Sequence, residues 1–184
     1  MMSIHKVSII TILVALCVAT NYALVGVPNV KVMDFIVFIS GFCFGPFTGI
    51  LTGILGWAVY GAINPYGFIL QVWLATMFSE SIYGLLGGLL GKTLASTNFN
   101  GERIKLSVFF GTMGFIPTLI YDMVTNFVYA SAFGIPVIVA IVFGAPFAIL
   151  HEVSNAAIFG VISMPVIVAL EKLSGGKRFG VSKK

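Results

Sequence analysis

Long apolar runs, separated by short polar or glycine- and proline-containing breaks, extend along the whole chain. The runs predict six helices, at residues 7–25, 32–44, 47–62, 68–90, 106–130 and 136–170. A helix that crosses a bilayer needs about 20 apolar residues, so we expect an all-α, polytopic membrane protein with six transmembrane helices. A single transmembrane domain would then occupy residues 1–184, and residues 171–184 would form a basic cytoplasmic tail.

Two of the runs depart from the usual length. The second run is short and ends at Gly45-Pro46, where proline cannot continue a helix. The sixth run is longer than a bilayer requires, so we expect a tilt, a kink at Pro146 or an extension into the cytoplasm.

The composition agrees with a chain that lies almost entirely in the bilayer. Hydrophobic residues make up 59% of the 184 residues and charged residues only 9%. A soluble fold of this size could not remove so much apolar surface from water, which excludes soluble enzymes and disordered proteins. Cys17 and Cys43 lie inside apolar runs, so we interpret them as packed side chains rather than a disulfide.

The basic residues predict the orientation in the membrane. If six helices alternate from a cytoplasmic N-terminus, nine of the ten Lys and Arg residues fall on the cytoplasmic side and only Lys31 falls outside. This asymmetry is typical of membrane proteins, whose cytoplasmic loops are rich in Lys and Arg. We therefore expect a multi-pass protein of the cell membrane with both termini in the cytoplasm. The few positive charges mark topology, and we expect no nucleic-acid partner.

Small residues recur at helical spacing in three places. Gly41, Gly45, Gly49 and Gly53 follow one another across the break at Pro46, so they predict two half-ridges on either side of a tight turn. A second set lies in the fourth run, at Gly84, Gly87, Gly88 and Gly91, and a third is the pair Ala15 and Ala19. Packing within the chain explains such patterns in most cases, and the alanine pair is the best candidate for contact with a partner protein.

Ionisable residues interrupt the apolar runs at three places, and each such residue is costly inside a bilayer. They are Glu80 in the fourth run, Asp122 in the fifth, and His151-Glu152 in the sixth. The remaining acids, Asp34, Glu102 and Glu171, fall in loops or at helix ends, where we expect no special role for them.

Helical phase brings further polar residues onto the same faces. Residues four apart share a face of a helix, as do residues seven apart. The predicted polar pocket is thus enclosed by the fourth, fifth and sixth helices, with Trp57, Tyr60 and aromatic residues of these helices at its border. Its candidate substrate-binding residues are Trp73, Glu80, Asp122, Asn126, Tyr129, His151, Glu152 and Asn155.

Three interpretations of these buried acids remain open. They can bind a ligand, they can carry protons in a stand-alone or proton-coupled transporter, or they can pair with one another structurally. For the cluster as a whole, a ligand pocket is the better interpretation.

Enzyme signatures are incomplete. The segment His151-Glu152-Val153-Ser154-Asn155 has Asn155 where a zinc protease needs its second histidine. Gly91-Lys92-Thr93 resembles the end of a phosphate loop, yet Leu86 stands where the first glycine belongs, so we expect no ATP hydrolysis by this chain. We predict no catalytic residue, no metal and no cofactor. An intramembrane enzyme built on His151-Glu152 is the least supported alternative.

Taken with the six-run layout, three motifs resemble the S components of energy-coupling factor (ECF) transporters, which capture vitamins and related micronutrients. Ala15-Leu16-Cys17-Val18-Ala19 is similar to the AxxxA motif of the first helix. Phe44-Gly45-Pro46-Phe47 and the glycines after it resemble the turn between the second and third helices. Ser81-Ile82-Tyr83-Gly84 and the glycines after it resemble the inner half of the fourth.

The resemblance implies a mechanism and partners. A vitamin-like substrate would enter from outside into a cavity built from helices four to six and the loop after helix one, here residues 26–31. Ala15 and Ala19 would dock on a transmembrane coupling protein, and two cytoplasmic ATPases would supply the energy. The acids favour a cationic or donor-rich ligand, while a neutral ligand that reads protonated carboxyl groups is equally open.

Overall fold

The chain is all-helical in the computed structural model, which describes residues 4–94 and 103–173. The six helices are α1 (Ile4–Ala23), α2 (Met33–Phe44), α3 (Pro46–Ala62), α4 (Leu70–Thr93), α5 (Arg103–Phe133) and α6 (Val137–Leu173). The predicted all-α chain with six helices is confirmed, and no strand occurs in the described ranges. Residues 95–102, within the break expected between the fourth and fifth runs, and the tail from residue 174 lie outside them.

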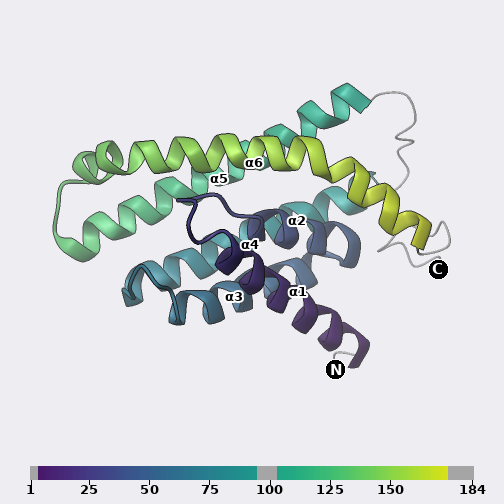
Figure 1. The fold of residues 1–184 in the computed structure, drawn as a ribbon, viewed down its shortest axis with the longest axis horizontal. Helices are drawn as coiled ribbons and strands as arrows, with labels where there is room; N and C mark the ends of the chain where they lie inside the picture. Colours follow the sequence, from purple (N-terminus) through teal and green to yellow (C-terminus); the bar gives the residue numbers. More distant parts are fainter. Residues whose placement is uncertain (1–3, 95–102, 174–184) are drawn as a thin grey trace.

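Three of the helices are long and apolar enough to cross a membrane. These are α1, α5 and α6, while α2 and α3 are apolar but shorter. The fourth helix, α4, has 24 residues and carries Glu80 and several hydroxyl side chains among its apolar residues. Helix α6 continues without interruption through Pro146, and Figure 1 shows its C-terminal part bending away from the axis of the rest.

The helices form two groups. Helices α5 and α6 run side by side, and Figure 1 shows this pair lying across the bundle of α1 to α4. Within that bundle, α4 packs most extensively against α3 and α2. The two groups meet where α4 contacts α5 and where α2 contacts α6. The loops after α1, α3 and α5 all lie toward the left side of Figure 1.

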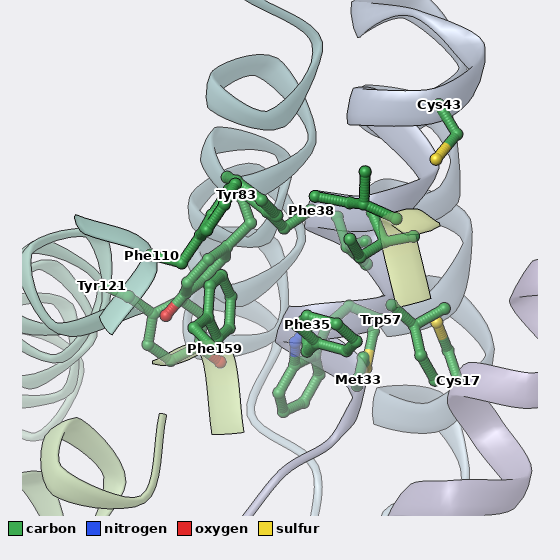
Figure 2. Packing of buried hydrophobic residues seen from close by; sticks show 14 of the residues in the cluster. Cys17, Met33, Phe35, Phe38, Cys43, Trp57, Tyr83, Phe110, Tyr121 and Phe159 are labelled. Atoms are coloured by element: carbon green, nitrogen blue, oxygen red, sulfur yellow. The ribbon is translucent and has the colours of Figure 1, made fainter. Parts of the chain in front are cut away.

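Helix α2 occupies the centre of the molecule. Every residue from Met33 to Gly41 is buried, which is expected for a helix that is apolar on all sides. Phe38 contacts Phe110 of α5 and Phe159 of α6, with ring centroids 6.2 and 5.1 Å apart. Figure 2 shows these rings beside Tyr83 and Phe35 in one aromatic cluster. This cluster joins the two helix groups.

The turn between α2 and α3 consists of Gly45 alone. Gly45 has φ of 94°, a conformation that favours glycine, and its N–H donates to the carbonyl of Gly41 at 2.8 Å. Pro46 then begins α3, where its missing N–H is not needed. The predicted break of the glycine series at Pro46 is therefore present.

Both halves of that series pack on α4. A Cβ at Gly41 would lie 2.0 Å from the carbonyl oxygen of Gly84, and one at Gly49 would lie 2.6 Å from the Gly84 Cα. On the other side, a Cβ at Gly87 would lie 2.0 Å from the carbonyl oxygen of Phe38. The glycines thus let the backbones of α2, α3 and α4 touch, as small residues do in membrane helices.

Candidate functional site

A cavity of about 410 Å³ opens between the loop after α1 and helices α3 to α6, and we call it the main cavity. Its size lies within the range of roughly 300–1,000 Å³ that is usual for small-molecule sites. It is lined by Asn29, Lys31, Trp57, Val72, Thr76, Tyr121, Asp122, Thr125, Asn126, Tyr129, Gly144, Phe147 and Ala148.

One wall of the main cavity is aromatic and carries a cation. The Lys31 ammonium lies 5.2 Å from the centroid of the Trp57 ring and 4.9 Å from that of Tyr121. Both distances fall within the range of a cation–π contact. The Trp57 ring is fixed by a further contact, since its Nε1 donates to Glu80 Oε2 at 3.0 Å. The backbone carbonyl of Trp57 accepts a hydrogen bond from Trp73 Nε1 at 3.1 Å.

A second group of lining residues is polar and comes from α5, and we call it the polar wall. Asp122, Thr125, Asn126 and Tyr129 follow one another at helical spacing and all line the cavity. The Asn126 amide nitrogen donates to the Asp122 carbonyl at 2.8 Å. Gly144 of α6 lies opposite, and a Cβ there would be 2.5 Å from Asn126 Oδ1. The missing side chain at residue 144 therefore lets α6 close against this wall.

Behind the polar wall, three ionisable side chains form a continuous chain that we call the polar triad: Asp34, His151 and Asp122. The His151 Nε2 lies 2.7 Å from Asp34 Oδ2, and its Nδ1 lies 3.1 Å from both carboxylate oxygens of Asp122. All three residues are buried. Because each ring nitrogen faces a carboxylate, an imidazolium can donate to both acids at once.

The polar triad continues into a network of neutral groups. Asn155 Nδ2 donates to Asp34 Oδ2 at 2.6 Å and lies 2.8 Å from Thr118 Oγ1, which in turn meets the Tyr83 hydroxyl at 2.7 Å. Side chains of α2, α4, α5 and α6 therefore join one buried network. This network, together with the aromatic cluster around Phe38 and Phe159, ties the two helix groups together.

The predicted site residues fall into four places. Asp122, Asn126 and Tyr129 line the main cavity. His151 and Asn155 lie behind it in the polar network, while Glu80 and Trp73 hold Trp57. Glu152 is buried, yet it does not line the main cavity and does not belong to the polar triad. Of the three acids expected to converge on one pocket, only Asp122 reaches the cavity.

The expectation that Asp34 needs no special role is wrong. Asp34 does lie at a helix end, but the start of α2 is inside the bundle and the side chain is fully buried. The signal in the sequence was its place as the one acid at the start of an otherwise apolar run, three residues after Lys31. Lys31 was also missed as a cavity residue. Of the aromatic residues expected at the border, Trp57 and Tyr129 line the cavity, and Tyr60 and Trp73 do not.

The alanine pair lies away from the cavity. Ala15 and Ala19 are both exposed on α1, and the neighbouring Ile12 and Leu16 are exposed as well. This face of α1 is therefore not covered by another described part of the chain.

A comparison with known protein families agrees with the motifs. The family model for the ECF-type riboflavin transporter, S component, matches residues 1–172. No solved structure matches the chain. Because the family match covers nearly the whole chain, the resemblance to S components is confirmed, and with it a role in vitamin uptake at a membrane. The chain belongs to the family of ECF-type riboflavin transporter S components.

Proposed function

We propose that the chain is the substrate-capture subunit of an ECF importer and that its substrate is riboflavin, bound in the main cavity. The matched family supports both parts, since its name specifies riboflavin and an S component. The observation that carries the assignment of the cavity is its pairing of an aromatic wall with a polar wall.

The two walls suit two chemical features of a flavin, its aromatic ring system and the polar edge of that ring system. The isoalloxazine ring is flat and aromatic, so it can stack on Trp57 and Tyr121 when the Lys31 ammonium over these rings moves aside. One edge of the flavin ring carries carbonyl and imide groups, which hydroxyl and amide side chains recognise. Thr125 and Asn126 of the polar wall supply such groups.

A neutral ligand fits the electrostatics of the cavity better than a cationic one. The acids are already engaged, because Asp34 and Asp122 share His151 and Glu80 accepts from Trp57. The charged group that lies against the aromatic wall is the Lys31 ammonium, which would repel a cationic vitamin. Of the two ligand classes that the sequence left open, the neutral one is therefore supported.

The proposed topology has six spans with both termini in the cytoplasm. The distribution of Lys and Arg supports it. The loops after α1, α3 and α5 lie on one side of the molecule, as alternating spans require (Figure 1). Asn29 and Lys31 in the first of these loops line the cavity, so the substrate would enter from outside.

The energy for transport would come from partners. We propose that the exposed Ala15 and Ala19 face of α1 docks on the transmembrane coupling protein, with two cytoplasmic ATPases attached to it. The absence of side-chain bulk at these two positions supports close approach of a partner helix.

Replacing Tyr121 tests the cavity assignment. Tyr121→Leu removes the ring, and we expect it to bind riboflavin about tenfold more weakly than Tyr121→Phe, since stacking of one aromatic ring contributes about 1–3 kcal/mol. The phenylalanine variant is the matched control because it keeps the ring and removes only a hydroxyl that is buried without a partner. Quenching of flavin fluorescence by the purified variants measures both affinities. Equal affinities for the two variants would place the flavin elsewhere.

A further inference from the structure

A second cavity, of about 120 Å³, lies beside the main cavity, and we call it the side chamber. It is enclosed by the C-terminal end of α1, the loop after it and the turn between α3 and α4. Asn29, Lys31 and Trp57 line both cavities, so the two adjoin across the Lys31 side chain.

The walls of the side chamber are fastened to each other by two tyrosines. The Tyr22 hydroxyl of α1 donates to the Ile63 carbonyl at 2.7 Å, and the Tyr66 hydroxyl donates to the Val25 carbonyl. These hydrogen bonds join the end of α1 and its loop to the turn between α3 and α4. The chamber is therefore preformed rather than a gap between independent loops.

Asn21 lines this chamber and carries an unsatisfied acceptor. Its side chain is only 4% exposed, and its amide nitrogen lies against the sulfur of Met33 at 3.0 Å, a weak acceptor. Its Oδ1 is buried and has no hydrogen-bond partner. A buried oxygen without a donor is costly, so this position calls for a group that donates a hydrogen bond to it.

Two more polar side chains line the side chamber, and each has an atom that can form a further hydrogen bond. Tyr60 packs edge-on against Tyr22 and Trp57, and its hydroxyl makes no hydrogen bond within residues 4–94 and 103–173. Asn64 Oδ1 accepts the N–H of Tyr66 at 2.9 Å, which turns the amide nitrogen the other way. That nitrogen has no partner in the same ranges, so it remains able to donate.

The hydrogen-bond donors and acceptors of the side chamber determine which kind of ligand group it can bind. A phosphate offers acceptors only and would meet the Asn21 oxygen unfavourably. Hydroxyl groups both donate and accept, so a polyhydroxyl chain can satisfy Asn21, Tyr60 and Asn64 together. The Lys31 ammonium between the two cavities, with no carboxylate in salt-bridge range among the described residues, adds a donor where such a chain would enter.

We propose that the side chamber receives the ribityl chain of riboflavin while the isoalloxazine ring occupies the main cavity. This inference rests on the proposed function, because it assumes that riboflavin is the substrate. It assigns Asn21 and Tyr60 as residues that distinguish a flavin with a polyhydroxyl chain from one without.

The test compares riboflavin with lumiflavin, which carries a methyl group where riboflavin carries the ribityl chain. Asn21→Leu and Tyr60→Phe keep similar shape and remove only polar atoms of the side chamber. We expect each to weaken riboflavin binding by about tenfold, the value of a lost hydrogen bond to a buried group, and to leave the lumiflavin affinity unchanged. Flavin fluorescence titration of the purified proteins measures both ligands. The unchanged lumiflavin affinity also shows that each variant is folded.

Asn126→Ala is the control, since Asn126 lines only the main cavity and its loss should weaken both flavins alike. The inference is overturned if Asn21→Leu and Tyr60→Phe weaken both flavins equally, or weaken neither. A wild-type protein that binds lumiflavin and riboflavin with the same affinity also overturns it while the proposed function stands. A wild-type protein that binds neither flavin overturns the proposed function itself.

Discussion

Replacing His151 with leucine is expected to destabilise the protein by about 3–5 kcal/mol, the usual cost of breaking a buried ionic network by removing one member. The His151 ring lies between Asp34 and Asp122, with one ring nitrogen facing each carboxylate. Without the imidazole, the buried carboxyl groups of Asp34 and Asp122 would face the space that it leaves, with no hydrogen-bond donor between them. Thermal unfolding of the purified variant in detergent should therefore show a large fall in the unfolding midpoint.

Two further variants make this result specific. His5→Leu is the matched control, because His5 is the other histidine of the chain and is exposed on α1. Combining His151→Leu with Asp34→Asn and Asp122→Asn replaces the two acids by neutral amides, so we expect it to recover much of the lost stability. A His151→Leu protein as stable as His5→Leu would show that the polar triad does not hold the two helix groups together.

Replacing Ala15 and Ala19 together with leucine is expected to abolish uptake and to leave riboflavin binding unchanged. Both alanines are exposed on a face of α1 that no described part of the chain covers, and neither lines the main cavity. Two leucines would keep a partner helix from the close approach that small residues allow. Uptake of labelled riboflavin by vesicles that contain the coupling protein and ATPases measures the first effect, and fluorescence titration measures the second.

The control changes alanine to leucine at two other exposed positions, Ala62 and Ala157. That double variant should transport normally, because added bulk there meets only lipid or solvent. Transport that survives Ala15→Leu with Ala19→Leu would refute the docking face. Uptake by vesicles that hold this chain alone and carry a proton gradient would instead favour the alternative of a proton-coupled carrier.

The arrangement of the helices was largely predictable because its signals are local. Apolar runs and the break at Gly45-Pro46 mark the helices, since each depends only on neighbouring residues. The glycine spacing predicted close helix packing, but it did not predict that Gly41 and Gly49 both contact Gly84 of α4.

The site residues were predictable only where a single helix determines which side chains share a face. Asp122, Asn126 and Tyr129 repeat at helical spacing, so their shared face was evident and all three line the cavity. Glu152 follows His151 directly, and adjacent residues on a helix point about 100° apart, so the two cannot share the place between Asp34 and Asp122.

The burial of Asp34 depended on the packing of the whole bundle. An acid at the start of a helix is ordinarily close to water, and its place in an apolar run three residues after Lys31 does not by itself show that α2 begins inside the molecule. Only the position of α2 between α4 and α6 brings Asp34 to His151 and Asn155. The same arrangement brings Lys31 onto the rings of Trp57 and Tyr121.

The most direct test of riboflavin as the substrate is a native mass spectrum of the purified protein after incubation with equal concentrations of riboflavin and thiamine. The aromatic wall, the engaged acids and the Lys31 ammonium predict one riboflavin bound to each chain and no thiamine. A spectrum with thiamine bound, or with neither vitamin bound, would contradict the proposed function.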